Sequence, residues 1–323
     1  MAAQFAKKTF NVLRSCHAPK LINWPHPKSL SKGEGLASCK SLTVISIADL
    51  KHFPAQRKLK FTFITKKNYF WLTNFLFPLV IALLKKEINS FLSSIIGYVV
   101  MIVFLLSIGL FMWIIPGTDF NILENGYANI DTLFIIAPWV FMFLIPAVTM
   151  RSFAEENKSG TIELLLTRPI SDLRIIFAKY AAGVILVLFS LVPTLVYFIS
   201  VWFLASPRGN VDVGAIMGSY FGLLFLCSAF VSIGVFASSL SNNQVISFLF
   251  AVIISFFFYT GFDSLSALST SGFLPTLLSQ IGISSHYTSM SRGVIDTRDM
   301  IYFITLTTFF LLLTKFIIEK RKW

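Results

Sequence analysis

The chain has 323 residues, of which 55% are hydrophobic and only 13% charged, and its mean hydropathy is +0.76. Soluble proteins carry about 25% charged residues, so this composition excludes a soluble globular fold. The net charge of +12 is uneven, because residues 1–82 hold thirteen of the 27 Lys and Arg residues but two of the fifteen acids. The basic character therefore belongs to the N-terminal quarter and not to the apolar remainder. No spacing typical of a disulfide framework or metal site links the cysteines, which are Cys16, Cys39 and Cys227.

The N-terminal quarter differs in kind from the rest of the chain. Residues 1–66 have no sustained hydrophobic period and contain four prolines, a pattern typical of disorder. An organellar transit peptide would also be basic and poor in acids. Residues 70–84 form an apolar run that is short for a span, and a span there would put the basic segment outside, against the positive-inside rule. We expect residues 1–82 to be a disordered or mis-annotated extension.

A short amphipathic segment follows. Residues 83–92 place apolar and basic side chains on opposite sides of a predicted helix; the apolar ones are Leu84, Ile88, Phe91 and Leu92. Such a helix suits the cytoplasmic interface of a membrane. A plain basic start to the first span would give the same pattern.

Six apolar stretches are long enough to cross about 30 Å of hydrocarbon, which takes about 20 residues. They cover residues 95–115, 131–150, 175–204, 213–236, 244–262 and 300–318. Residues 83–323 are therefore predicted to form an all-α, polytopic membrane domain. Lys179 lies one turn inside the third stretch, where we expect its long side chain to reach the interface.

The orientation of the spans in the membrane follows from the positions of the Lys and Arg residues. If the chain before the first span is cytoplasmic, eleven basic residues of the membrane domain lie inside, and only Arg208, Arg292 and Arg298 lie outside. The positive-inside rule then predicts that both termini are cytoplasmic.

The inside loop at residues 151–172 is unusual. It contains a helical acidic stretch, a break at Gly160 and a second short helix that starts at Thr161 and ends at Pro169. A leucine face beside carboxylates suits docking into a groove on a partner protein. The same pattern fits a hairpin that packs beneath the helices.

This loop also carries a family resemblance. The pattern Glu155-Glu156-x-x-x-Gly160-Thr161-x-Glu163-x-Leu165-Leu166-x-x-Pro169 resembles the signature coupling loop of type-2 ABC exporter permeases. The order of an interfacial helix, two spans, the loop and four spans is similar too. Residues 273–298 resemble the half-helices that precede the sixth span in that family. Within it, residues 83–323 are most similar to the permeases of the gliding-motility-associated ABC transporters of the Bacteroidetes.

The resemblance implies a bacterial inner-membrane permease with an ABC ATPase subunit and a second permease subunit as partners, and no nucleic acid. ATP and Mg²⁺ would bind the ATPase, because the sequence has no G-x-x-x-x-G-K-[ST] phosphate loop; no catalytic, metal or cofactor site is expected in this chain. The implied contacts with the ATPase are Glu155, Glu156, Gly160, Thr161, Glu163, Leu165, Leu166, Arg168 and Pro169.

Other polar groups have plainer interpretations. Arg292, Asp296, Arg298 and Asp299 favour an outer-face salt-bridge cluster over a substrate gate, and the lone His286 favours a structural role. The amides of 242–244 fit a cytoplasmic turn, and the glycines of residues 218–234 fit close helix packing.

Two other functions remain open. An ion-coupled secondary transporter would need ionisable residues at the midplane of the membrane, which these spans nearly lack. A non-transporting anchor of a motility or secretion complex is compatible with the same sequence.

Overall fold

The structure is a computed structural model that describes residues 80–162, 171–268 and 273–320, all within one compact unit. These residues form helices and turns without a strand. Six of the helical segments are long and apolar enough to cross a membrane. The predicted all-α, six-span fold is therefore confirmed.

The six long segments correspond to the six predicted spans, with ends that differ by a few residues. They are α3 (Ile95–Gly109) with η2 (Leu110–Ile114), α5 (Asp131–Thr149), α8 (Asp172–Leu191) with η3 (Val192–Thr194) and α9 (Leu195–Leu204), α10 (Val213–Leu240), α11 (Gln244–Phe256) with η4 (Phe257–Gly261) and α12 (Phe262–Leu268), and α15 (Thr297–Lys320). Shorter helices are α4 (Ile122–Asn125), α6 (Arg151–Ser159), α13 (Phe273–Ile281) and α14 (Ile283–Met290). Residues 80–92 are also helical, as predicted for the interfacial segment.

Local chemistry explains several helix ends. The carboxylate of Asp212 accepts a hydrogen bond from the backbone N–H of Ala215 at 3.0 Å and caps α10. Asn243 caps α11 by accepting from the N–H of Val245 at 2.9 Å, which confirms the predicted turn. Pro193 lies in the 3₁₀ turn that interrupts the third span, because proline has no N–H for the α-helical ladder.

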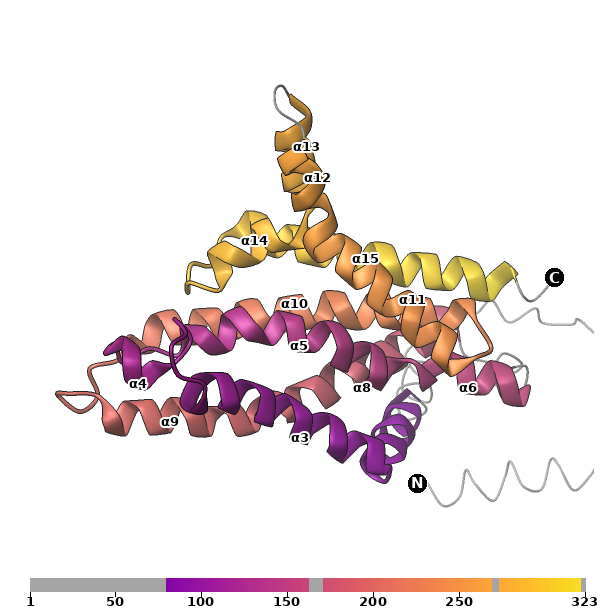
Figure 1. The fold of residues 1–323 in the computed structure, drawn as a ribbon. Helices are drawn as coiled ribbons and strands as arrows, with labels where there is room; N and C mark the ends of the chain where they lie inside the picture. Colours follow the sequence, from indigo (N-terminus) through magenta and orange to yellow (C-terminus); the bar gives the residue numbers. More distant parts are fainter. Residues whose placement is uncertain (1–79, 163–170, 269–272, 321–323) are drawn as a thin grey trace, which may run out of the picture. The chain divides into compact units, whose positions relative to one another are not determined.

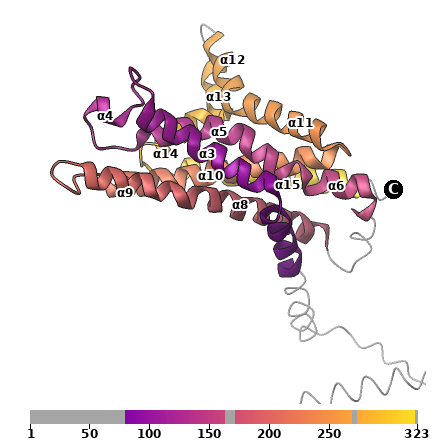
Figure 2. The same cartoon turned by 60° about the horizontal axis from the view of Figure 1, so that its bottom comes forward.

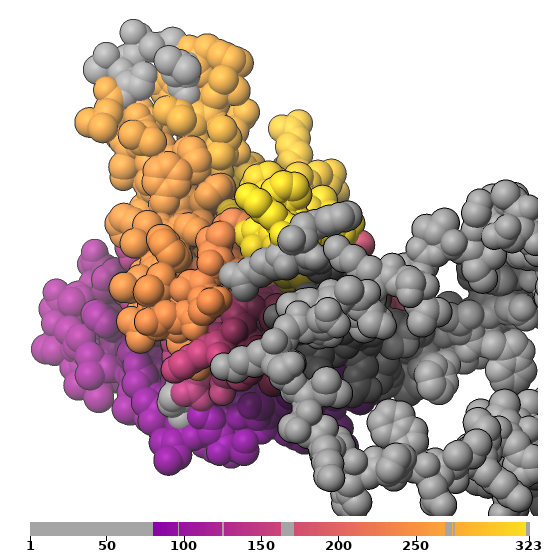
Figure 3. Space-filling model, turned by 90° about the vertical axis from the view of Figure 1, so that its right-hand side faces the viewer, coloured from indigo at the N-terminus to yellow at the C-terminus, as the bar shows by residue number. Residues whose placement is uncertain are grey.

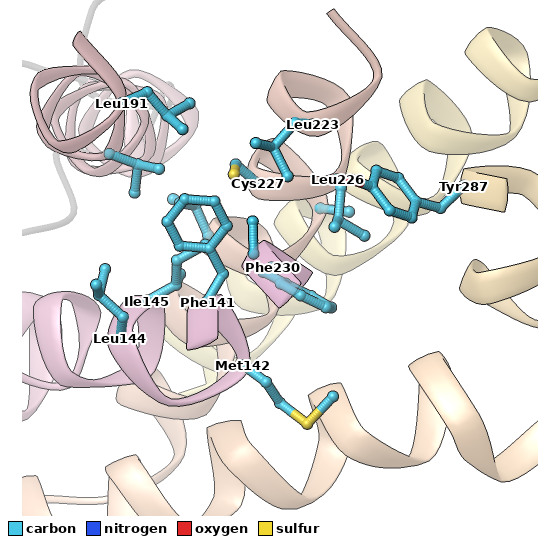
Figure 4. Close-up of a cluster of buried hydrophobic side chains, with 14 of the residues drawn as sticks. Phe141, Met142, Leu144, Ile145, Leu191, Leu223, Leu226, Cys227, Phe230 and Tyr287 are labelled. Atoms are coloured by element: carbon cyan, nitrogen blue, oxygen red, sulfur yellow. The ribbon is translucent and has the colours of Figure 1, made fainter. Parts of the chain in front are cut away.

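Helix α10 is the central column of the bundle. It packs against α5, α8, α11 and α15, and 72% of its most apolar stretch is buried, against 22% for the spans of α3 and α11. Figure 4 shows part of the core, where Phe230 of α10 lies near Phe141 of α5, and Leu226 of α10 lies near Tyr287 of α14. The first and fifth spans are therefore the ones that leave most apolar surface for lipid or another chain.

Glycines allow α10 to approach its neighbours closely. A Cβ on Gly222 would lie 2.6 Å from Cβ of Met290, and one on Gly234 would lie 2.0 Å from Oγ1 of Thr149. Real Cβ contacts are essentially never that short. The predicted packing role of these glycines is confirmed.

The fifth and sixth spans are joined by a helical excursion. Helices α12 and α13 pack on each other and project from the side of the bundle, and α14 returns to α10 and α15 (Figures 1 and 2). The short helices expected at residues 273–298 are thus present as α13 and α14. They bring the chain back to the start of α15.

Candidate functional site

The predicted docking segment begins where the second span ends. After Met150 the chain continues directly into α6, which ends at Gly160 in the left-handed conformation (φ +70°) that favours glycine at a helix C-terminus. The exposed Thr161 follows, and its hydroxyl lies 2.9 Å from that of Ser159. The acidic helix and glycine break were therefore predicted correctly. Five predicted contacts lie outside the described residues, namely Glu163, Leu165, Leu166, Arg168 and Pro169.

One face of α6 is anchored to the central helix. Phe153 and Ala154 are buried, and their backbone N–H groups donate to Oγ of Ser238 on α10 at 2.8 and 3.1 Å. The Ser238 hydroxyl in turn donates to the carbonyl of Met150 at 3.1 Å. These three bonds satisfy free backbone groups at the start of α6. They fix α6 to the most buried span.

The opposite face of α6 is open. Glu155, Lys158 and Ser159 are exposed. A polar hollow of about 710 Å³ lies between Lys158 and the turn that joins α10 to α11. Figure 3 looks onto this end of the molecule, where α6 lies between the orange start of α11 and the indigo N-terminal helices. This face offers charged and hydrogen-bonding groups to a partner.

Glu156, a predicted partner contact, instead points into the protein. Its Oε2 lies 3.1 Å from Nζ of Lys179, and its Oε1 lies 3.3 Å from Nζ of Lys86. Lys179 also lies 2.9 Å from Oε1 of Glu87 and donates to the carbonyl of Ser152 at 2.6 Å. The Glu156 carboxylate is thus engaged within the chain.

The expectation that Lys179 reaches the membrane interface is wrong. Its side chain is 0% exposed, and its ammonium group lies 5.0 Å from the centre of the Phe153 ring. The helix of residues 80–92 and α6 bring two carboxylates and a carbonyl to Lys179, so its charge is compensated inside the protein.

The predicted outer-face salt-bridge cluster does not form among the described residues. The carboxylate of Asp296 accepts from the backbone N–H of Arg298 at 3.1 Å, as a residue before a helix often does. Asp299 lies in the first turn of α15, where its Oδ1 is 2.7 Å from Nδ1 of His286. The salt bridges within the described ranges include neither Arg292 nor Arg298.

His286 has the structural role that was predicted, but it is not alone. Its Nε2 lies 2.9 Å from the carbonyl of Gln280, and the Tyr302 ring stacks on it with centroids 4.0 Å apart. Ser289 donates to the other oxygen of Asp299. This cluster ties α14 to the end of α13 and the start of α15. Sequence spacing offered no signal for it, because a turn separates the partners.

The helices and this end segment define a class of protein. Six long apolar helices make the chain a multi-pass membrane protein, and a further helix, α6, continues from the second span.

The family comparison agrees with that class. The model of the ABC-2 family transporter proteins matches residues 83–260, and the chain belongs to this family. The match covers the segment from the interfacial helix into η4. No curated protein matches the sequence. The family consists of membrane transport components without an ATPase site of their own, and it implies an ABC ATPase as partner.

Proposed function

We propose that residues 83–323 form the permease domain of an exporter-type ABC transporter that couples to ATP hydrolysis on a separate subunit through residues 151–172. One observation carries the proposal: α6 has an exposed face of charged residues, while its other face is bonded to α10 through Ser238. The exposed charges offer a partner groups to bind, and the bonds to Ser238 hold the segment in place against the spans.

The connection of α6 to the spans suits force transmission. Helix α6 continues from α5 at one end and is hydrogen-bonded to α10 along its first turn. A displacement of α6 by the ATPase would therefore act on the second and fourth spans together. Close packing at Gly234 and Thr149 makes these spans a stiff pair.

The remaining assignments complete the proposal. Two copies of the permease, or this chain and a related one, would enclose the transport path, with both termini in the cytoplasm of a bacterium and the spans in its inner membrane. ATP and Mg²⁺ would bind the ATPase. A role in gliding motility rests on the similarity of residues 83–323 to the gliding-motility-associated permeases.

Copurification tests the docking assignment. The full chain is purified from membranes with its ATPase subunit, either unaltered or with Glu155→Lys and Leu165→Asp. We expect the ATPase to copurify with the unaltered chain and to be lost at least about tenfold from the double variant, because an apolar contact expected in the interface would be replaced by a charge. Arg208→Glu, an exposed change in the loop between α9 and α10, is the matched control. Equal recovery with all three proteins would contradict the docking role.

A further inference from the structure

Four charged side chains meet where the first, second and third spans reach the proposed cytoplasmic side. Lys86 and Glu87 come from the helix of residues 80–92, Glu156 from α6 and Lys179 from α8. We call these four residues the charge cluster. Lys179 is its centre, since its ammonium group pairs with both carboxylates, and two positive and two negative charges leave the cluster neutral.

Burial makes the two ion pairs of Lys179 strong. The side chain of Lys179 is fully buried, and those of Glu156 and Glu87 are 12% and 21% exposed. Charges in such surroundings attract each other far more strongly than in water. Separating one pair would leave a buried charge without its partner, which is strongly unfavourable. The Lys86–Glu156 pair differs, because Lys86 is 65% exposed and its attraction is screened.

The cluster joins three helical segments through charged side chains. Helix α6 packs chiefly against α10, and Lys179 links it to α8 and to the half-buried Glu87 of the 80–92 helix. A further contact, from Nη1 of Arg151 to Oγ of Ser94, is long at 3.5 Å. A movement of α6 can therefore reach the 80–92 helix through the buried pairs of Lys179 as well as through the exposed Lys86–Glu156 pair.

We propose that Lys179 is a positioning residue that makes the interfacial helix, α6 and the start of α8 move as one unit when the ATPase acts on α6. This inference rests on the proposed function and extends it, because it adds Lys179 and Glu87, which no docking motif contains. It also gives Glu156 a role inside the permease instead of a contact with the ATPase.

Hydrogen exchange in the complex with the ATPase can distinguish a residue that transmits the movement of α6 from one that only stabilises the fold. Amide exchange is compared in residues 80–92 and 151–159, without nucleotide and after trapping with ATP and vanadate. In the unaltered complex, trapping should change exchange in both segments. In Glu87→Gln, Lys179 keeps Glu156, so the change should persist in 151–159 and disappear from 80–92. A nucleotide response that still reaches residues 80–92 in Glu87→Gln would overturn the inference.

Two further variants are controls for a general loss of stability. Lys179→Arg keeps the charge and should retain the response in both segments, and Lys86→Met removes the screened pair and should also retain it. Loss of the response in Lys86→Met equal to that in Glu87→Gln would contradict the central role of Lys179.

The proposed docking to an ATPase can be refuted independently of the role of Lys179. If no ATPase copurifies with the unaltered chain, docking is refuted, and nucleotide-free exchange still tests the cluster. Lys179→Met should then accelerate exchange in both segments roughly tenfold or more, because both buried pairs are lost. Unchanged exchange in that variant would overturn the cluster as a link.

Discussion

Replacing Gly218 by alanine tests a close backbone approach between α10 and the turn before α15. A Cβ at this position of α10 would lie 2.4 Å from the carbonyl oxygen of Gly293 and 2.9 Å from its Cα. Ordinary contacts begin near 3.4 Å, so α10 and the turn before α15 would have to separate by about 1 Å. The obstructing atoms are backbone atoms, and no side-chain rotation can relieve the overlap.

The size of the effect follows from what that separation breaks. Overpacking costs about 1–3 kcal/mol. The hydrogen bond from Oγ of Ser219 to the carbonyl of Ser291, now 2.8 Å, would be stretched and would lose about 1 kcal/mol. We therefore expect Gly218→Ala to lower the free energy of unfolding by about 2–4 kcal/mol.

Reversible unfolding in mixed micelles would measure this change. Gly214→Ala is the matched control on the same helix, because its Cβ would meet nothing closer than 3.4 Å. It should be neutral or stabilise the protein by up to about 1 kcal/mol, since alanine favours the helix. If Gly218→Ala and Gly214→Ala unfold alike, the close approach of α10 to the turn at Gly293 does not exist in solution.

Three further substitutions address the polar contacts, each measured by the same unfolding assay unless stated. Ser238→Ala should lower the free energy of unfolding by about 1–3 kcal/mol, because two buried N–H groups of α6 lose their acceptor. Ser239→Ala should lower it less, because the Ser239 hydroxyl donates to the carbonyl of Phe236 in the same helix. Equal effects of the two substitutions would argue against the anchoring of α6 by Ser238. Lys179→Met should lower the free energy of unfolding by about 3 kcal/mol, because its pairs are buried, and Lys86→Met should lower it by less than about 1 kcal/mol, because Lys86 is exposed. The reverse order would contradict the burial of Lys179. Asp299→Asn should speed hydrogen exchange in α14, since the carboxylate that holds two of its side chains loses its charge, and unchanged exchange would mean that the cluster does not hold α14.

The spans were predictable because the bilayer sets their length and hydrophobicity, and these properties are local in sequence. The cap at Asn243 was predictable for the same reason, since its partner is two residues away. The irregular turns within the spans were mostly not predictable. Pro193 marks the 3₁₀ turn in the third span, but the π-helical turns η2 and η4 contain apolar residues that would suit a regular helix.

The polar pairs of the candidate site escaped prediction because they depend on tertiary contacts. Lys179 meets Glu87 across 92 residues, and only the folded arrangement of three helices brings the two together. The motif around Glu156 predicted a docking segment, but it could not tell which side of α6 faces the protein. That distinction follows from the position of Ser238 on α10, which fixes the rotation of α6 about its own axis.

The π-helical turn η4 (Phe257–Gly261) lies between α11 and the projecting pair α12 and α13. A π turn is an α-helix with one residue inserted, and each residue of an α-helix turns the chain by about 100°. The wider π turn takes up the inserted residue, so deletion of one residue of this turn other than the buried Tyr259 would restore a regular helix and leave the direction of the α12–α13 pair nearly unchanged. A deletion of one residue within the middle of α11 has no such compensation and would rotate everything after it by about 100°.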